Sequence, residues 1–298
     1  WRNGHRQPKK CGDRSSMLLR LRAQHGGTVT ALLGLAMAEG LIDTALVSGR
    51  NDEGEPQGTL VADKGELAGY AKSRFIVSPT VAAFNRIDAK DREKTGIVAT
   101  PCQAQALAKI RTAVIDGCSQ AQSVGLVIGL FCGWTLAAEK FRGLLERFFI
   151  PFADLDAMDI PPGFNMLELR SSEKTLLMPL DEVDEYVRGA CRYCVDSTAQ
   201  FADVSVGAAR CGMDPGEMRG WNQVIVRSLR GEKLIELARQ KGALEIREAP
   251  AGALRELKEA AAEKKRQGLE NIVAKSGSKK NLLYLKNYGP AAGKRENR

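Results

Sequence analysis

Residues 96–111 read GIVATPCQAQALAKIR, and this stretch shows how the chain folds. The apolar run at 96–100 predicts a buried strand, and Pro101 then stands in the first turn of a helix that we expect over 102–111. The N–H groups of the first turn of a helix have no hydrogen-bond partner within the helix. Proline, which lacks an N–H, is therefore favoured there. A strand that leads directly into a helix is typical of layered α/β proteins, so the stretch predicts an α/β fold.

The same alternation of short apolar runs and longer amphipathic runs continues on both sides of this stretch. Further strands are expected at residues 44–48, 124–132, 203–207, 223–228 and 244–247, and a hairpin at 166–180. Further helices are expected at residues 28–40, 63–72, 136–149, 232–241 and 254–275, the second of them opened by the capping-box sequence Asp63-Lys64-Gly65-Glu66. Residues 151–163 resemble a loop-rich join. The pattern predicts a mixed sheet flanked by helices, with a smaller C-terminal α+β portion and a C-terminal helix.

The composition indicates the class of protein. With 298 residues, 44% of them hydrophobic, the chain can bury the core of one large domain or two small ones. No apolar run approaches the roughly 18 residues that a membrane span needs, and the polar, basic start does not resemble a signal peptide. We therefore expect a cytoplasmic protein with no membrane span, in which clustered cysteines serve metal or redox chemistry rather than disulfides.

The basic charge is concentrated at the two ends of the chain. Residues 1–22 carry 7 lysines and arginines against 1 acid, and residues 255–298 carry 12 against 5, whereas residues 23–254 carry 25 against 30. The chain has no nucleic-acid recognition motif and no aromatic residues interleaved with the basic ones, so we expect no nucleic-acid partner. We expect residues 1–22 to be a basic arm outside the fold, either native or added, and residues 251–298 to be a helix and basic tail that dock on a partner.

Four cysteines stand in positions that suit ligands. Cys102 and Cys132 each follow a predicted strand, where open α/β sheets place their ligands, and Cys191 and Cys194 form a C-x-x-C. Four thiolates suit either an iron–sulfur cluster or a zinc ion. Spacing alone leaves both possibilities open, together with a third in which the thiols are ordinary buried side chains. Cys211, near the C-x-x-C, is a reserve ligand.

Two further segments suit an anionic ligand. Residues 24–30, QHGGTVT, open a helix with bare backbone amides and two hydroxyls, and such helix ends favour phosphate groups. Residues 72–79, KSRFIVSP, add basic side chains and a serine. An ordinary helix cap and a solvated helix end remain alternative interpretations of these segments. The chain has no G-x-G-x-x-G and no Walker loop, which argues against a Rossmann or P-loop nucleotide site.

Seven segments, taken in order, resemble one family, the beta subunits of coenzyme F420-reducing hydrogenase and of the related F420-linked formate dehydrogenases. They are QHGGTVTALL at 24–33, SP at 78–79, TPCQ at 100–103, GLFC at 129–132, GACRYCVD at 189–196, ADVSVG at 202–207 and GWNQVIVR at 220–227. The resemblance covers residues 23–275. Several matched motifs in one order are far more specific than any of them alone.

The resemblance implies one FAD and one [4Fe–4S] cluster in an α/β fold, with the deazaflavin coenzyme F420 as substrate. Hydride would pass between F420 and the flavin, and single electrons between the cluster and a hydrogenase, formate dehydrogenase or heterodisulfide reductase partner. The family's metal-binding cysteines match Cys102, Cys132, Cys191 and Cys194. The positions that match flavin-contacting segments are Gly26, Gly27, Thr28, Thr30, Lys72, Arg74, Ser78, Thr100, Asp196, Asp203, Gly207, Trp221 and Arg227. Because the flavin carries the chemistry, no catalytic acid or base is expected.

On this resemblance, residues 23–150 are an N-terminal α/β part that binds flavin and cluster, and residues 151–250 are a C-terminal α+β part with the C-x-x-C. Many relatives carry Gly-Thr-Lys-Tyr or Gly-Ser-Lys-Tyr before the Ser-Pro, where this chain has Lys72-Ser73-Arg74-Phe75, and arginine differs from lysine in hydrogen-bond geometry. His25, Lys72 and Arg74 are candidates for stabilising reduced, anionic flavin. The chain has no additional ferredoxin-type cysteine run, so one cluster is the limit.

Two other functions remain open at this point. One is an NAD(P)H- or ferredoxin-linked flavin and iron–sulfur reductase subunit that acts on another substrate. The other is a zinc-bearing assembly subunit without enzyme activity, whose basic tails hold a complex together. Colour separates the second from the main hypothesis, since a zinc protein is colourless and a protein with flavin and cluster is yellow-brown.

Overall fold

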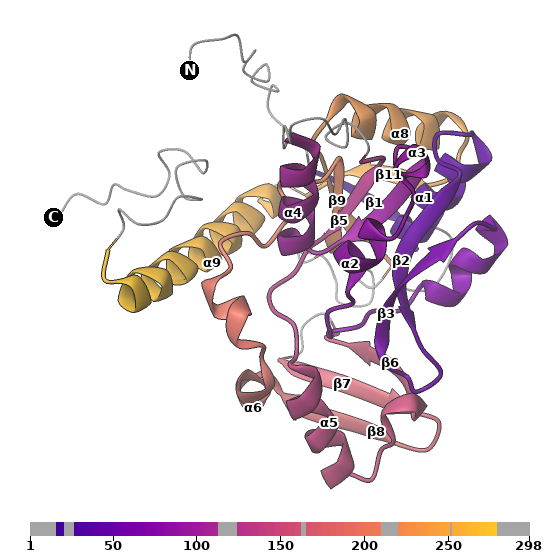
Figure 1. Ribbon diagram of the computed structural model, residues 1–298. Helices are drawn as coiled ribbons and strands as arrows, with labels where there is room; N and C mark the ends of the chain where they lie inside the picture. Colours follow the sequence, from indigo (N-terminus) through magenta and orange to yellow (C-terminus); the bar gives the residue numbers. More distant parts are fainter. Residues whose placement is uncertain are drawn as a thin grey trace, which may run out of the picture.

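The computed structural model describes residues 16–20, 27–112, 124–161, 165–209, 220–250 and 252–278, the first of these ranges as backbone. Its centre is an eight-stranded sheet in the order β11-β1-β10-β9-β5-β4-β2-β3. A second sheet, in the order β6-β7-β8, lies beside it with its own helix (Figure 1). The predicted α/β class, mixed main sheet, smaller α+β portion and C-terminal helix are confirmed.

Four neighbouring strands of the main sheet are parallel: β2 (Thr44–Arg50), β4 (Thr95–Ala99), β5 (Val127–Leu130) and β9 (Val204–Ala208). The strands that pair antiparallel beside them are β3 (Pro56–Val61) at one edge, and β10 (Asn222–Val226), β1 (Ser16–Arg20) and β11 (Glu245–Glu248) on the other side. Since β1 and β9 both run opposite to β10, β1 points the same way as the parallel strands. The carboxyl ends of five strands therefore meet at one edge of the sheet, which we call the carboxyl edge.

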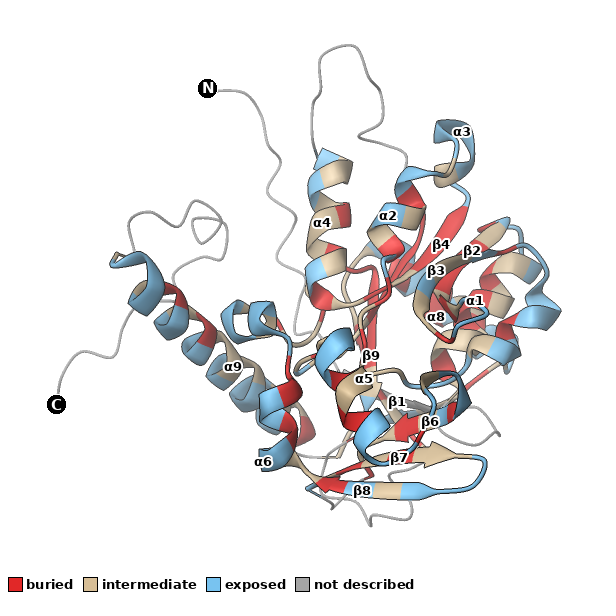
Figure 2. Cartoon of the chain, turned by 60° about the horizontal axis from the view of Figure 1, so that its bottom comes forward, coloured by how far each residue is buried: buried red, intermediate tan, exposed pale blue. Residues whose placement is uncertain are grey.

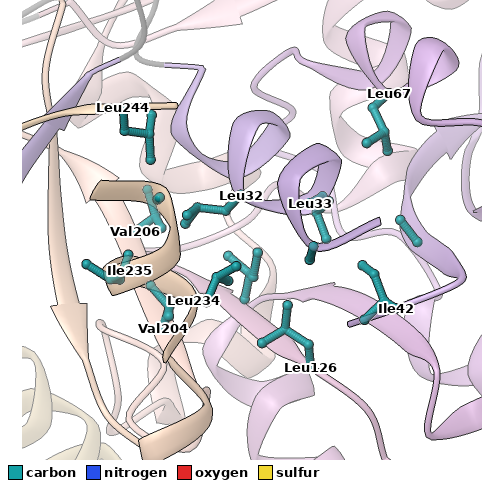
Figure 3. Close-up of a cluster of buried hydrophobic side chains, with 14 of the residues drawn as sticks. Leu32, Leu33, Ile42, Leu67, Leu126, Val204, Val206, Leu234, Ile235 and Leu244 are labelled. Carbon is teal, nitrogen blue, oxygen red and sulfur yellow. The ribbon is translucent and has the colours of Figure 1, made fainter. Parts of the chain in front are cut away.

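Helices cover both faces of this sheet. On one face, Leu32 and Leu33 of α1 meet Leu234 and Ile235 of α8 over the buried strands (Figure 3). On the other face, α2 and α4 pack over the neighbouring strands, and the buried Ile97 of β4 belongs to that core. The bounds are Thr28–Ala38 for α1, Thr80–Asn85 for α2, Pro101–Thr112 for α4 and Leu229–Gln240 for α8. Because α1 leads from the carboxyl end of β1 to the start of β2, its N-terminus lies at the carboxyl edge.

The small sheet has a separate core. Its antiparallel strands are β6 (Leu155–Asp159), β7 (Met166–Ser171) and β8 (Thr175–Pro179), and α5 (Ala138–Arg147) packs on them. Phe141 and Leu145 of α5 are buried with Leu167 and Leu169 of β7. The hairpin predicted at 166–180 is therefore confirmed. The remaining short elements are α3 (Ala89–Arg92), α6 (Leu180–Val183) and the 3-10 helices η4 (Phe152–Asp154), η5 (Asp184–Tyr186) and η6 (Gly189–Tyr193).

The structure corrects three local expectations. Ser16–Arg20, which was assigned to the arm outside the fold, is strand β1, paired on both sides within the main sheet. The segment expected to be a loop-rich join contains strand β6. Leu155 and Met158 of this strand are buried, and the residues between and after them are exposed or half-buried. The helix expected at 63–72 is the 3-10 helix η2 (Lys64–Tyr70); the carboxylate of Asp63 caps it as predicted, but its two glycines disfavour a regular α-helix.

The main sheet takes strands from both sides of the division that we expected at residue 150. Strands β2 to β5 precede that point, and β9 to β11 follow it. The separate core belongs instead to an excursion between β5 and β9, which includes α5 and the small sheet. The C-x-x-C follows this excursion directly, just before the chain returns to the main sheet.

The C-terminal helix α9 (Ala253–Ser276) is exposed over most of its surface, as Figure 2 shows. Its buried positions are Ala253, Gly268 and Ile272. Among the described residues, no helix combines the length and the apolar character that crossing a bilayer requires.

Candidate functional site

The four cysteines predicted as ligands come from three elements around the carboxyl edge. Cys102 lies in the first turn of α4, directly after β4, and Cys132 follows β5. Since β4 and β5 are neighbours in the sheet, these two residues leave the edge side by side. Cys191 lies in η6, and Cys194 caps its end. The backbone N–H of Cys132 donates to the carbonyl of Ser197 at 2.9 Å, which ties the two halves of the cysteine set together.

The thiols lie within electrostatic reach of one another. Burial raises the pKa of Cys132 to about 12, and the neighbouring thiols of Cys191, Cys102 and Cys194 add to this effect. Burial also raises the pKa of Cys194. Without a metal group, burial favours the protonated thiols of Cys132 and Cys194, and a metal group that binds them has to displace those protons.

Hydrogen-bonding groups surround the sulfur atoms. The backbone N–H of Thr135 donates to the Sγ of Cys191 at 3.4 Å, and the Thr135 hydroxyl lies 3.3 Å from the same sulfur. The hydroxyl of Thr100 lies 3.3 Å from the Sγ of Cys102. Such donors stabilise thiolates and help to set the potential of iron–sulfur centres.

A set of four cysteines is the usual ligand set of an iron–sulfur cluster and also of a structural zinc ion. Tetrahedral zinc, with Zn–S bonds of about 2.3 Å, requires its sulfurs to lie within about 4 Å of one another. Among the described residues, no three histidine, cysteine, aspartate or glutamate side chains converge in a way that could hold a single metal ion. A cubane cluster spaces its thiolates more widely, and a set of cysteines alone is its usual ligand set. Cys11, Cys118 and Cys211, including the reserve ligand, lie outside the described residues.

A hydrogen-bond network at the carboxyl edge leads from Arg74 toward the cysteines. The guanidinium of Arg74 donates from Nη1 to the carbonyl of Ser48, at 3.2 Å. The hydroxyls of Ser48 and Ser78 share a short hydrogen bond. The amide of Gln103 donates to the carbonyl of Ser78 at 2.6 Å.

Gln103 continues this network to the first cysteine. Its Oε1 accepts the backbone N–H of Thr100 at 2.9 Å and the Thr100 hydroxyl at 3.0 Å. The same hydroxyl reaches Cys102. Three residues that sequence reasoning assigned to the flavin, Arg74, Ser78 and Thr100, thus lie in one network that ends at a predicted cluster ligand.

Arg74 and Arg50 form a pair of neighbouring positive charges. Burial lowers the pKa of Arg74, and the charge of Arg50 lowers it further. The Nε of Arg74 is buried without a hydrogen-bond partner. Arg50 donates to the carbonyls of Ala153 and Leu155, and within the described ranges neither guanidinium has a salt-bridge partner. Two half-buried guanidiniums without a salt-bridged carboxylate suit an anionic ligand.

The N-terminus of α1 has the form that the sequence predicted. Gly27 caps the helix in a left-handed conformation, with φ +30°, and makes no side-chain cap. Thr28 is buried and Thr30 is half-buried. Gly26 and His25 lie outside the described residues. Lys72 is exposed on the segment that leads to Arg74.

The remaining predicted flavin residues are used by the protein's own framework. The buried carboxylate of Asp203 accepts the N–H of Val127 at 2.8 Å and the hydroxyl of Ser228 at 2.7 Å. Asp196 accepts the N–H groups of Thr198 and Gln200, both at 2.9 Å. These contacts hold in place the loop after the C-x-x-C and the starts of β5 and β9, at the edge of the sheet opposite the carboxyl edge.

Three further positions have clear packing roles. Arg227 donates to the hydroxyl of Ser205 at 2.6 Å and to the carbonyl of Thr198 at 2.9 Å. At Gly207 any side chain would overlap the ring of Phe131. Trp221 is buried, with the guanidinium of Arg247 4.6 Å from its ring centre. Whether these residues also contact flavin stays a prediction.

Sequence reasoning missed several groups in this region. Arg50 and Thr135 stand in no recognised motif, and Gln103 belongs to the matched segment TPCQ but was given no role of its own. Each of the three contacts a residue that is far away in the sequence. A usable signal existed only for Ser48, which ends a predicted strand at the ligand-binding edge.

Comparison with known proteins identifies related chains. Residues 14–85 match the family model described as "Coenzyme F420 hydrogenase/dehydrogenase, beta subunit N-term", and residues 92–251 match the model for the C-terminal part of the same beta subunit. The chain is 30% identical to the coenzyme F420 hydrogenase subunit beta of Methanothermobacter thermautotrophicus, over 85% of this chain and 89% of that protein. It is 27% identical to the F420-dependent formate dehydrogenase subunit beta of Methanocaldococcus jannaschii, over 92% of this chain and 68% of that protein.

A solved structure shares the fold. A chain of the F420-reducing [NiFe] hydrogenase complex from Methanosarcina barkeri superposes with a TM-score of 0.76. The superposition covers 87% of this chain and 90% of that chain, at 22% sequence identity.

Proposed function

Because the chain belongs to the coenzyme F420 hydrogenase/dehydrogenase beta-subunit family, we propose that it is the FAD- and [4Fe–4S]-binding subunit of an F420-linked oxidoreductase complex. When bound, the flavin would exchange hydride with F420, and the cluster would exchange single electrons with a partner subunit. One observation carries the proposal: the set of four cysteines lies at the same edge of the sheet as the Arg74–Ser78–Thr100 network and is connected to it.

In this proposal Cys102, Cys132, Cys191 and Cys194 hold the cluster. The backbone N–H of Thr135 donates to the Cys191 sulfur and withdraws negative charge from it. The hydroxyls of Thr135 and Thr100 lie beside the sulfurs of Cys191 and Cys102 and help to position them. Cys132, Cys191 and Cys194 are half-buried, whereas Cys102 is exposed.

The flavin occupies the carboxyl edge beside the network. The N-terminus of α1, which Gly27 caps without a side chain, presents the positive end of the helix dipole to a phosphate. Arg74, with Arg50 behind it, offers fixed positive charge to an anionic part of the cofactor. Asp196 holds the loop after the C-x-x-C, and Gly207 and Trp221 lie near this edge, in β9 and directly before β10. Asp203 and Arg227 lie at the opposite edge of the sheet, directly before β9 and directly after β10, so in this proposal they brace the sheet that carries the site.

The partner is a hydrogenase, formate dehydrogenase or heterodisulfide reductase module. Relatives that carry hydrogenase and formate dehydrogenase names support the first two. Clustered thiolates need a reducing compartment, so we propose that the complex works in the cytoplasm.

The test is anaerobic purification with the natural partner subunits, followed by assay of iron, acid-labile sulfide, zinc and FAD. We expect a yellow-brown protein with FAD and one cluster, whose flavin absorbance bleaches with reduced F420 and not with NADH. Stoichiometric zinc without iron would contradict the proposal. Bleaching by NADH alone would support the nicotinamide-linked alternative instead.

A further inference from the structure

We propose that the C-terminal helix α9 forms one wall of the cysteine site, and that Lys264 on this helix supplies a fixed positive charge that raises the reduction potential of the group held there. The inference rests on the proposed cluster. It concerns a part of the chain that the family models do not cover, because the matched residues end at 251 and α9 begins at Ala253. It also revises the expectation that residues 251–298 serve only to dock a partner.

The first contact joins α9 to the loop after β5. The ammonium group of Lys264 donates a short hydrogen bond to the carbonyl of Gly133, the residue after Cys132. Lys264 and Gly133 are 131 positions apart in the sequence, so only the tertiary fold brings them together.

The second contact joins α9 to the C-x-x-C. A Cβ atom on Gly268 would lie 2.5 Å from the carbonyl oxygen of Cys194 and 3.2 Å from the Cγ1 of Val195. One turn further on, the side-chain amide of Asn271 donates to the carbonyl of Arg192 at 2.8 Å. Helix α9 therefore rests on the backbone of the C-x-x-C, and the glycine at 268 permits this close approach.

The charge of Lys264 is available to the thiols. Its ammonium group bonds to the carbonyl directly after Cys132, and one turn further along α9 the backbone of Gly268 lies against the carbonyl of Cys194. Nearby ion pairs of α9 join Arg266 to Glu263 and Glu270, and among the described residues no carboxylate pairs with Lys264. The positive charge beside the cysteines is thus not neutralised.

The consequence for electron transfer follows from the sign of the charge. A group held by four thiolates becomes more negative when it accepts an electron from the flavin or the partner. A fixed cation nearby therefore stabilises the reduced form more than the oxidised form. Because the site is partly buried, salt screens this interaction less than it screens a surface pair.

The variant Lys264→Met, in the full chain with its partner, tests the role of this charge. The midpoint potential is measured by a redox titration monitored by electron paramagnetic resonance. We expect unchanged iron content. The equilibrium between the oxidised and reduced forms should shift about tenfold toward the oxidised form, which lowers the midpoint potential of a one-electron couple by about 59 mV. Lys264→Arg should restore most of the potential. Lys275→Met is the control, since Lys275 is exposed and lies about 16 Å further along the same helix.

The wall is tested by Gly268→Ala against Gly143→Ala. Both glycines lie inside helices, but an added methyl meets the Cys194 carbonyl at position 268 and nothing within 4 Å at position 143. We expect Gly268→Ala, but not Gly143→Ala, to lose iron. In the metal-free protein, Cys194 should be alkylated faster in Gly268→Ala than in wild type.

The outcomes separate the two proposals. If wild type holds a cluster, yet Lys264→Met leaves its potential unchanged and Gly268→Ala leaves iron content and Cys194 reactivity unchanged, the role of α9 is overturned. If wild type holds no iron, the proposed function itself fails, whatever the variants do.

Discussion

At the scale of single residues, the site contains groups whose arrangement does not stabilise the fold. Arg74 has a buried Nε without a partner, and Arg50 repels it. Neutral side chains at these positions would give a more stable fold. A protein therefore keeps such an arrangement where a bound ligand compensates for its cost.

Arg74→Gln should therefore separate binding from stability. We expect FAD affinity to fall by roughly ten- to a hundredfold, since a charge-assisted hydrogen bond is worth about 1.5–3 kcal/mol. The melting temperature of the FAD-free protein should stay the same or rise, because the repulsion from Arg50 is relieved. Equilibrium dialysis and calorimetry measure the two quantities.

Arg86→Gln is the control for this experiment, because Arg86 is an exposed residue at the end of α2. A loss of stability in Arg74→Gln equal to its loss of affinity would show that Arg74 serves the fold and not the ligand.

Cys191→Ser tests the cluster at the residue scale. The serine hydroxyl is a poor iron ligand, so we expect the loss of most iron and of the broad visible absorbance, with FAD retained. Cys118→Ser, outside the four predicted ligands, should leave both signals intact. Equal iron in the two variants would remove Cys191 from the ligand set.

At the scale of elements, the turns that lead from a strand into a helix position the proposed ligand-binding residues. The first turn of α4 carries Cys102, and the N-terminus of α1 presents Gly27 at the same edge. Open α/β sheets repeatedly use this edge, because parallel strands end there together and helix N-termini point at it.

Gly27→Asp tests the α1 terminus. Aspartate adopts a left-handed conformation more readily than most side chains, and its charge suits the helix dipole, so the variant should fold. It should lose FAD, because the carboxylate repels the phosphate that we place there. The readout is the ratio of bound flavin to protein.

Gly27→Asn provides the matched control, because it has nearly the same shape and conformational preference without the charge. We expect it to keep more FAD than Gly27→Asp. Equal FAD in the two variants would place the phosphate elsewhere.

At the scale of the whole molecule, the C-terminal region divides into two parts. Helix α9 contacts the C-x-x-C of its own chain, whereas residues 279–298, with six basic residues and one acid, lie outside the described residues. The two parts should therefore serve different tasks.

Two truncations test this division. Deleting residues 279–298 should preserve iron and FAD but weaken co-purification with the partner, increasingly so at higher salt, because screening shortens the reach of surface charge. Deleting residues 253–298 should also lower the iron content, because it removes the helix that rests on the C-x-x-C at Gly268. Loss of iron in the shorter truncation would show that the tail belongs to the cofactor site.

Local sequence patterns were enough to predict a large part of this protein. Alternating strands and helices, Pro101 in the first turn of α4, the hairpin at 166–180 and the position of Cys102 and Cys132 after strands were all predictable. Each of these depends on local periodicity or on the rule that ligands follow parallel strands, which a single sequence displays.

The remaining features depend on the three-dimensional fold. It places Ser16–Arg20 inside the sheet, Arg50 beside Arg74, and Lys264 against the loop after Cys132. These contacts join segments whose own residues do not specify a partner: a short apolar run, a strand-end arginine and a charged helix. Which partner each segment meets depends on the order of strands in the sheet and on the helix packing that follows from it, and both are properties of the whole chain.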